Sequence, residues 1–411
     1  MRPSDKKLVA FPGAAPPARE RDPRIDVFRG IALLMILVDH IPGNPYEALT
    51  IRNFGFSDAA EGFFLMSGIA AGIAYSGNIE RWRDGRGSIG AAGGPIWRRA
   101  WTLYLVQLFM TLWALAMFAG AAQLFVQPDL IEQHNISRMF ETPLAAFPGL
   151  AALTYQVGYV NILPTYIVLL LVTPFVLRAG LRAPWFVLGA ATLVWFAGGW
   201  ARWNVPNSPG GGGWFFSPVT WQMIFVLGLM VGVSHRRGER LVPVSRAGFA
   251  LAAGFLILVL AWRHVPGMGA WMNHKMWVLG SWGVPDNLIT HTKSYLGAPR
   301  LLHALALAYV LSCLPAVRRA SAHRFAAPFR LLGRQGLAVF ATGTILALAC
   351  QILMDVEPDA RWLGWVLPPI AVALSLLLAA LLDGKRRRKE PHETAAPAAA
   401  APRPGGVAAE A

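Results

Sequence analysis

Two side chains suited to proton and acyl transfer lie inside the first apolar stretch of this sequence, residues 25–41. Arg29 and His40 are eleven positions apart. On an α-helix this spacing leaves them about 20° from a common face and roughly 16 Å apart along the axis. Ionisable groups within an apolar stretch are costly and usually face a cavity or a partner. Because histidine can take a proton from an alcohol near neutral pH or carry an acyl group, we predict a site that uses both residues.

Carboxylates near His40 are candidates to orient and stabilise its imidazole. Asp39 lies about 100° around the helix from His40, so it cannot face the ring directly. Asp58 and Glu61, at the start of the second apolar stretch, are better placed, and we predict that they are catalytic together with His40. The alternative is that His40 only caps the outer end of its helix at the membrane surface.

Arginines next to the third apolar stretch have the chemistry of a phosphate site. Trp97-Arg98-Arg99 opens that stretch. An arginine guanidinium binds phosphate oxygens with two parallel hydrogen bonds, so we predict that Arg98 and Arg99 bind a phosphorylated donor. An anchoring role at the membrane surface is the alternative for at least one of them.

A further cationic group opens the eighth apolar stretch. Lys293 precedes it, and Arg300 and His303 follow with i, i+3 spacing, so these two share one helix face. We expect both residues on the outer side of the membrane, at a depth similar to that of His40. A cation and an imidazole there suit an acyl carboxylate or a sugar hydroxyl. We predict that all three bind the acceptor or the acyl group; for Lys293, contact with lipid headgroups is the open alternative.

The elements that must position these residues are membrane helices. Of the 411 residues, 55% are hydrophobic and only 14% are charged, whereas a soluble chain carries about 25% charged residues. Stretches of about 17–25 apolar residues predict an all-α polytopic membrane protein with about ten transmembrane helices. They lie near residues 25–41, 57–75, 97–121, 162–177, 185–200, 219–233, 247–262, 298–313, 337–353 and 362–382.

Basic residues alternate from loop to loop along the chain. They gather in the loops that follow the second, fourth, sixth, eighth and tenth stretches. By the positive-inside rule, this distribution places both termini in the cytoplasm. Topology therefore accounts for the net charge of +15, and we expect the lipid bilayer rather than nucleic acid as a partner.

Three long connections are expected on the outer side, at residues 127–161, 202–218 and 263–297. Long loops on one side of a helical bundle commonly cover a site. The histidines in these loops, His134 among them, have no metal-ligand spacing, so we expect ordinary loop histidines and no metal site.

Two glycine pairs predict close helix contacts. Gly68 with Gly72, and Gly228 with Gly232, each have the small-xxx-small spacing that lets helix backbones approach each other. We expect tight helix packing at both pairs.

The composition divides the chain into three parts. Residues 1–21 are polar and Pro-rich, and residues 385–411 form a basic run followed by an Ala/Pro-rich tail. Neither segment can bury an apolar core, so both are predicted to be disordered in the cytoplasm. Residues 22–384 are predicted to form the transmembrane domain.

Several motifs together resemble the OpgC family, within the acyltransferase-3 group of transmembrane acyltransferases. The most specific is the opening segment, in which Arg29 and His40 match the Arg-x10-His helix of that group. The group often has an Arg-x-x-Arg pair on its third helix, where this chain has Arg98-Arg99. Further similar segments are Arg24-Ile-Asp26, Asp39-His40-Ile-Pro-Gly-Asn44, Ser57-Asp58-Ala-Ala-Glu61, Asn161-Ile-Leu-Pro164, Trp221-Gln222, Tyr295-Leu-Gly297 and Leu332-Gly333-Arg334-Gln335.

The resemblance implies an acyl-CoA-dependent O-acyltransferase of the bacterial inner membrane. For the OpgC family, the acyl group is succinyl and the acceptor is a hydroxyl of a periplasmic glucan. His40 matches the catalytic histidine, and Arg29 matches the arginine of the same motif. No permanently bound cofactor is implied. Succinyl-CoA is a donor substrate, expected to be bound by Arg29, Arg98, Arg99 and Arg334, with its phosphates near the last three.

Two other functions stay open at this point. One is an O-acetyltransferase that modifies a surface polysaccharide. The other is a glycan exporter or transporter that uses the same charged residues for gating or proton relay. His40 is either a general base or a transient acyl carrier, and the oligomeric state is left open.

Overall fold

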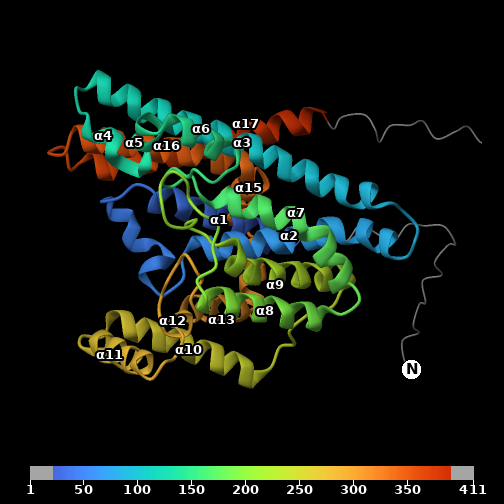
Figure 1. The fold of residues 1–411 in the computed structure, drawn as a ribbon. Coiled ribbons are helices and arrows are strands. Elements are labelled where there is room, and N and C mark those ends of the chain that lie inside the picture. Colours follow the sequence, from blue (N-terminus) through green and yellow to red (C-terminus); the bar gives the residue numbers. More distant parts are fainter. Residues whose placement is uncertain (1–21, 390–411) are drawn as a thin grey trace, which may run out of the picture.

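The computed structural model describes residues 22–389, and the regular elements within them are helices (Figure 1). An isolated β-bridge joins Pro206 to Gly213. The all-α prediction is therefore confirmed. The predicted terminal segment 1–21 lies outside the described residues, as do residues 390–411.

Each predicted apolar stretch corresponds to a helix of the bundle in Figure 1. These helices are α1 (Pro23–Asp39), α2 (Ala59–Arg83), α3 (Ile89–Leu124), α7 (Ile162–Gly180), α8 (Pro184–Trp200), α9 (Pro218–Arg237), α10 (Arg246–His264), α13 (Ala298–Cys313), α16 (Gly336–Val356) and α17 (Leu363–Lys389). The sequence pattern therefore located the long helices correctly, within a few residues at most ends.

Seven helices in the described part of the chain are long and apolar enough to cross a bilayer, namely α2, α3, α7, α9, α10, α16 and α17. α13 meets the same condition only together with α14 (Pro315–Ala322), and the two are bent by 79° at their junction. α1 and α8 are shorter, with 17 residues each. These findings are consistent with a polytopic membrane protein. About ten spans and cytoplasmic termini stay predictions.

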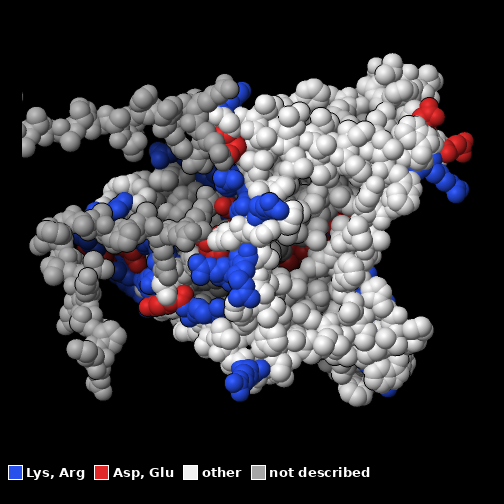
Figure 2. All heavy atoms as spheres, turned by 180° about the vertical axis from the view of Figure 1, so that it is seen from behind, with Lys and Arg blue, Asp and Glu red and all other residues white. Residues whose placement is uncertain are grey.

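The bundle has two ends, which we name by their residues. The basic end carries the loops after α2, α7 and α9, and Figure 2 shows Lys and Arg side chains gathered toward it, on the left of that view. The His40 end is opposite, where α1 finishes. It also carries η1 (Pro45–Leu49), η2 (Ile51–Asn53), α4 (Asp129–Glu132), η3 (Gln133–Asn135), α5 (Ser137–Glu141), α6 (Pro143–Ala151), α11 (Met268–Ser281) and α12 (Asp286–Ile289).

Glycines bring α2 and α9 into backbone contact. A Cβ atom added at Gly72 would lie 2.3 Å from the carbonyl oxygen of Leu229 and 3.0 Å from the Cα of Gly232. Gly68 and Gly228 face each other in the same way one turn away. The predicted tight packing at both glycine pairs is confirmed, and the two pairs pack against each other.

The segment between α13 and α16, which we expected to be a loop, contains helices that pack on α1. η4 (Arg324–Ala326) and α15 (Ala327–Arg334) follow α14. A Cβ added at Gly30 would lie 2.0 Å from the carbonyl oxygen of Phe329. This close approach carries the end of α15 and the start of α16 to the side of α1.

The last helix extends beyond the predicted limit of the transmembrane domain. α17 continues to Lys389, past the predicted boundary at residue 384. Leucine, alanine, lysine and arginine all favour the helical state, which explains why the helix continues into the predicted tail.

Candidate functional site

A cavity of about 580 Å³ lies between α1, α2, α3, α7, α15 and α16. Most of its wall is apolar, but three arginines reach it. Arg29 comes from α1, Arg99 from α3 and Arg334 from α15. Three of the four residues predicted to bind the donor therefore line one cavity, although they come from distant parts of the chain.

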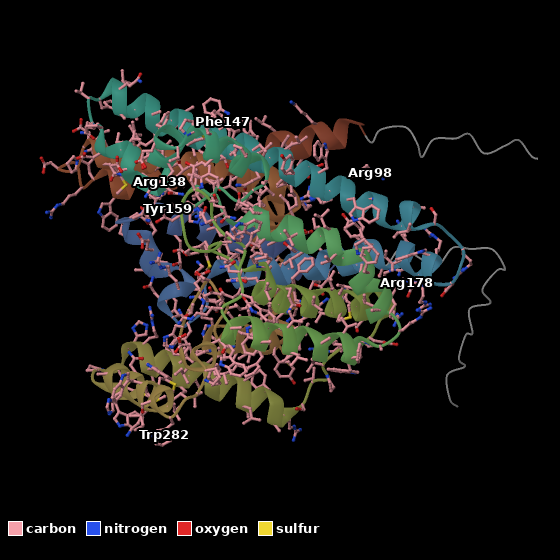
Figure 3. The ribbon with its side chains drawn as sticks, viewed as in Figure 1. Arg98, Arg138, Phe147, Tyr159, Arg178 and Trp282 are labelled. Atoms are coloured by element: carbon pink, nitrogen blue, oxygen red, sulfur yellow. The ribbon has the colours of Figure 1, made fainter. Side chains whose placement is uncertain are left out.

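The fourth predicted donor residue, Arg98, is exposed and does not line this cavity. Consecutive residues of a helix point about 100° apart, so Arg98 and Arg99 cannot both face the same cavity. Figure 3 places Arg98 toward the basic end. This position fits the anchoring alternative for Arg98 and leaves Arg99 as the member of the pair that faces inward.

Two of the arginines in the cavity wall are held by neighbouring groups. Arg29 Nη1 donates to the carbonyl oxygen of Gly333 at 3.2 Å and lies 3.6 Å from Asp26 Oδ1. Arg334 Nη1 lies 3.9 Å from Asp383 Oδ1. Because a guanidinium stays charged in proteins, these contacts orient the arginines without discharging them.

The first turn of α16 also faces the cavity. Gly336, Leu337 and Ala338 belong to its wall, and the N-cap residue Gln335 makes no side-chain capping hydrogen bond. The first amides of a helix have no intrahelical acceptor, and the helix dipole adds partial positive charge at this end. Together with the three arginines, this helix start forms a wall suited to phosphate oxygens.

Aromatic rings line the part of the cavity nearest the His40 end. The ring of Phe63 lies 5.8 Å from that of Tyr166 and 5.8 Å from that of Phe340, measured between centroids. All three belong to the cavity wall, which follows α2 from Phe63 to Tyr75. That stretch of helix is about 18 Å long. The cavity is therefore elongated, with the Phe63, Tyr166 and Phe340 rings at one end and Tyr75 with Arg99 near the other.

His40 lies beyond the aromatic end of the cavity. Leu33 lines the cavity, and His40 follows it on α1 by about 10 Å at the usual helical rise. From the other side, Leu163 lines the cavity, and the ring of the nearby Tyr159 lies 4.6 Å from the ring of His40. Figure 3 places Tyr159 toward the His40 end. The aromatic end of the cavity therefore faces His40, which lies outside the cavity wall.

His40 is the C-cap of α1, and its ring nitrogen Nδ1 is unpartnered. The backbone N–H of His40 donates to the carbonyl oxygen of Ile36 at 3.0 Å, which closes the helix. Nδ1 is buried and has no hydrogen-bond partner among the described residues. Leaving such an atom unpaired costs about 1–3 kcal/mol. His40 therefore caps its helix and also keeps a ring nitrogen available for bonding.

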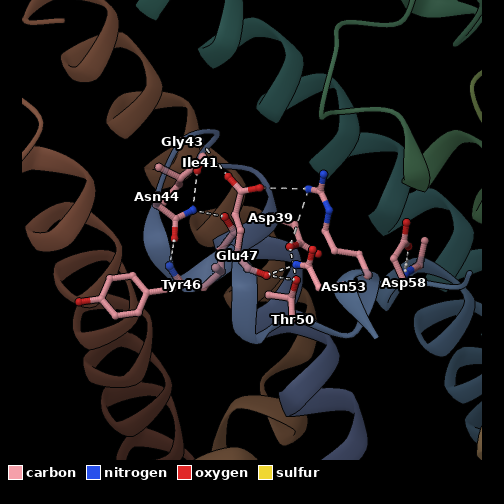
Figure 4. Close-up of polar contacts among 12 residues, drawn as sticks. Asp39, Ile41, Gly43, Asn44, Tyr46, Glu47, Thr50, Asn53 and Asp58 are labelled. Atoms are coloured by element: carbon pink, nitrogen blue, oxygen red, sulfur yellow. Dashed lines mark hydrogen bonds and ion pairs between the residues drawn. The ribbon is translucent and has the colours of Figure 1, made fainter. Parts of the chain in front are cut away.

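The loop after His40 folds back on the end of α1 (Figure 4). Asn44 Nδ2 donates to the carbonyl oxygen of Val38 at 2.9 Å, which satisfies one of the last helical carbonyls. Asp39 accepts from Thr50 Oγ1 at 2.7 Å and lies 3.9 Å from Arg52 Nη1. Asp39 therefore fixes this loop rather than orienting the His40 imidazole.

Asp58 and Glu61 bind the cations Lys293 and Arg300 rather than His40. Arg300 Nε donates to Glu61 Oε1 at 2.8 Å, and Arg300 Nη2 lies 3.0 Å from Asp58 Oδ2. Lys293 Nζ donates to the same Asp58 oxygen at 2.6 Å. Asp58 and Glu61 also form the capping box that begins α2. The four residues make a compact network in which two cations face two carboxylates.

His303 binds the segment that leads into this capping box. Its Nδ1 lies 2.7 Å from Ser57 Oγ and 3.4 Å from the backbone nitrogen of Ser57. Because that backbone N–H can only donate, Nδ1 is the accepting nitrogen. A Cβ added at Gly55 would lie 2.0 Å from the imidazole, so only glycine fits there. Arg300 and His303 are both buried, whereas the Lys293 side chain keeps 31% of its exposure.

The structure adds contacts to His40 that the sequence did not predict. Gln351 donates to the main-chain oxygen of His40 and bonds His134 on its other side. Burial lowers the pKa of His134 below its usual value of 6.5, although the Gln351 hydrogen bond opposes this shift. We had expected His134 to be an ordinary loop histidine. No local pattern could reveal the contact, because His134 and Gln351 are 217 positions apart.

The chain was compared with models of protein families. The family described as OpgC protein matches residues 21–387, which is nearly the whole chain. Among curated proteins, none matches this sequence.

Proposed function

Since the chain belongs to the OpgC family, we propose that it is a membrane O-acyltransferase that transfers a succinyl group from acyl-CoA to a hydroxyl of a periplasmic glucan. Membership supports a glucan-modifying acyltransferase in general. The identities of the acyl group, the donor and the acceptor are the proposed part.

The single observation that carries this proposal is the elongated cavity with unlike ends. Arg29, Arg99, Arg334 and the start of α16 line it, and Phe63, Tyr166 and Phe340 line the end that faces His40, which itself lies beyond the cavity wall. A CoA thioester has the same division, because its phosphates are anionic while its pantetheine arm and acyl end are long and thin. The donor would lie with its phosphates at the arginines and its thioester toward His40.

In the proposed reaction, His40 acts as general base. It takes the proton of a glucan hydroxyl while the oxygen attacks the thioester carbonyl. The C–O bond forms, the C–S bond breaks, and the CoA thiolate receives the proton. The unpartnered Nδ1 of His40 suits it to this proton transfer. A transient acyl group on the imidazole is the other route open to the same residue.

The outer ion network would serve the acyl end of the donor. A succinyl group ends in a carboxylate, and Lys293 is the partly exposed cation of the network. We propose that Lys293 leaves its ion pair with Asp58 and binds the succinyl carboxylate instead. Arg300 and His303 hold the start of α2 in place. Asp58 and Glu61 then act as counter-ions that keep the two cations oriented.

The proposed placement in the cell follows from topology. With the basic end in the cytoplasm of a bacterial inner membrane, the arginines face the compartment that contains acyl-CoA. His40 then lies toward the periplasm, where the glucan is found.

The test is acyl transfer in membrane vesicles with labelled succinyl-CoA and periplasmic glucan. The wild-type protein should transfer the label, and His40→Ala should abolish transfer. His274→Ala, which changes an exposed histidine on α11, is the matched control and should keep full activity. Full transfer by His40→Ala would refute the proposed role of His40.

The mass of the modified glucan separates succinyl transfer from the acetyl alternative. A succinyl group adds about 100 Da and an acetyl group about 42 Da to the acceptor hydroxyl, from group composition. If glucans from a deletion strain still carry both substituents, the result would instead favour the alternative that the protein is a glycan exporter. The described residues contain one bent helix pair, α13 with α14, rather than the matched broken helices of an inverted-repeat transporter.

A further inference from the structure

Gln351 of α16 connects two histidines at the His40 end of the bundle. Its Nε2 donates to the main-chain carbonyl oxygen of His40. Its Oε1 lies 2.7 Å from Nε2 of His134, which belongs to η3. The Gln351 side chain is buried, with 5% of its surface exposed. The contact therefore links the end of α1 to the loop that carries His134 through Gln351, near the end of α16.

The directions of both hydrogen bonds follow from the chemistry of the atoms. A main-chain carbonyl can only accept, so the amide nitrogen of Gln351 must face His40. The amide oxygen then faces His134, and Nε2 of His134 must carry the proton that it donates. Burial lowers the pKa of His134, which favours the neutral ring that this arrangement requires near pH 7.

The loop that presents His134 is fixed in an uncommon conformation. His134 and Tyr159 have φ angles of 56° and 62°, in the left-handed region that side chains rarely adopt. The backbone N–H of Gly158 donates to the carbonyl oxygen of His134 at 2.9 Å. Backbone strain of this kind persists only where the surroundings enforce it.

Tyr159 completes the surroundings of His40. Its ring lies 4.6 Å from the His40 ring and 5.1 Å from the His134 ring, so it stands between the two imidazoles. The outer loop thus contacts His40 through the Tyr159 ring and, by way of Gln351, through a hydrogen bond. The Tyr159 contact restricts the imidazole itself, and the hydrogen bond fixes the backbone from which the imidazole projects.

We propose that His134 and Gln351 are positioning residues for His40. His134 orients the Gln351 amide, and the amide holds the carbonyl of His40, which has no helical partner after the end of α1. The backbone of His40 is thereby fixed, and with it the position from which the imidazole projects beyond the aromatic end of the cavity. The catalytic role of this positioning rests on the proposed function. The contacts that position His40 are independent of it.

The first test measures the orientation without using acyl transfer. Diethyl pyrocarbonate modifies accessible imidazole nitrogens, and peptide mass spectrometry of the full-length protein in detergent gives the rate at His40. Gln351→Leu should change this rate at least about threefold, because a ring released from its positioning contact samples more orientations. His134→Leu should have the same effect.

A matched control tests whether this effect is specific. Gln133 donates to Asp355 at 3.1 Å, so it joins the same loop to the same helix one turn beyond Gln351. Gln133→Ala should leave the rate at His40 unchanged. Equal changes in Gln351→Leu and Gln133→Ala would overturn the proposal, as would the absence of any change in Gln351→Leu.

The second test uses the proposed reaction. Gln351→Leu should lower kcat about tenfold or more, because a misplaced catalytic group loses rate steeply. KM for acyl-CoA should stay within about twofold, since the arginine cavity is untouched. His134→Gln, which retains an N–H donor for the Gln351 oxygen, should recover much of the activity lost in His134→Leu.

The two tests separate the two proposals. If wild-type protein transfers no acyl group to glucan, the proposed function fails, while the modification rate at His40 still reports on positioning. If the wild type is active and Gln351→Leu has normal kcat, the positioning proposal fails and the proposed function stands.

Discussion

The side-chain amide of Gln351 donates a hydrogen bond to the main-chain carbonyl of His40, 311 positions earlier in the chain. The end of α1 is therefore fixed by a residue of α16. The loop that follows His40 also fixes this helix end, because Asn44 Nδ2 donates to the carbonyl oxygen of Val38. Together these contacts give the candidate catalytic histidine a defined place, which a helix terminus on its own would not provide.

Arg99 and Arg98 should differ in their effect on donor binding. Arg99 lines the cavity, whereas Arg98 is exposed on another face of α3. We expect Arg99→Ala to raise KM for acyl-CoA about tenfold, which corresponds to about 1.4 kcal/mol, with kcat nearly unchanged. Arg98→Ala should leave KM within about twofold. Initial rates in vesicles measure both, and equal increases in KM would argue against a donor site at Arg99.

Lys293 should determine the preference for a donor with a terminal carboxylate. Succinyl-CoA has this carboxylate, and butyryl-CoA has a methyl group in its place. In Lys293→Gln, we expect the ratio of kcat/KM for succinyl-CoA to that for butyryl-CoA to fall about tenfold, since a charge-assisted hydrogen bond is lost.

Each Lys293 variant is compared with itself on two donors, so any loss of folded protein cancels from this ratio. Lys293→Arg should keep most of the preference. An unchanged ratio in Lys293→Gln would show that Lys293 serves only as the partner of Asp58.

The buried pair of Arg300 and Glu61 should be sensitive to removal of one partner. Glu61 has no exposed surface, so Arg300→Leu leaves a buried carboxylate without that partner, which costs about 3–5 kcal/mol. Thermal unfolding of the detergent-purified protein should show a clear decrease in Tm. Adding Glu61→Gln to Arg300→Leu should recover part of it, because the unpaired charge is removed.

The exposed pair of Arg202 and Asp286 provides the control for this experiment. Their side chains keep 65% and 56% of their exposure, and such surface pairs contribute about 0–1 kcal/mol. Arg202→Leu should therefore leave Tm almost unchanged. A decrease as large as that of Arg300→Leu would contradict the distinction between the two pairs.

The contact between α2 and α9 should not accept a single methyl group. In Gly72→Ala, the new Cβ would meet the carbonyl oxygen of Leu229 at 2.3 Å, and overpacking of this kind costs about 1–3 kcal/mol. Gly120→Ala adds the same atom on α3 where nothing lies within 4 Å, so Tm should be unchanged or slightly raised. Equal Tm values for the two variants would contradict the close approach.

The sequence by itself determined the helices and the first candidate functional residues. Apolar stretches of sufficient length located the long helices of the bundle, because a chain surrounded by lipid has few other ways to satisfy its backbone. The eleven-residue spacing placed Arg29 and His40 on nearly one face of α1, since the geometry of one helix follows from spacing alone. The glycine spacing likewise predicted the tight packing of α2 and α9.

Only the tertiary structure decided which residues meet. Local spacing cannot show that Arg334 joins Arg29 and Arg99 in one cavity, because α15 reaches α1 through a close approach at Gly30. The partners of Asp58 and Glu61 depended in the same way on how α13 packs beside α2. Gln351 lies 311 positions from His40, so their contact was beyond any sequence pattern. Helices follow from local chemistry, whereas a site between helices depends on side chains that the packing of the whole bundle brings together.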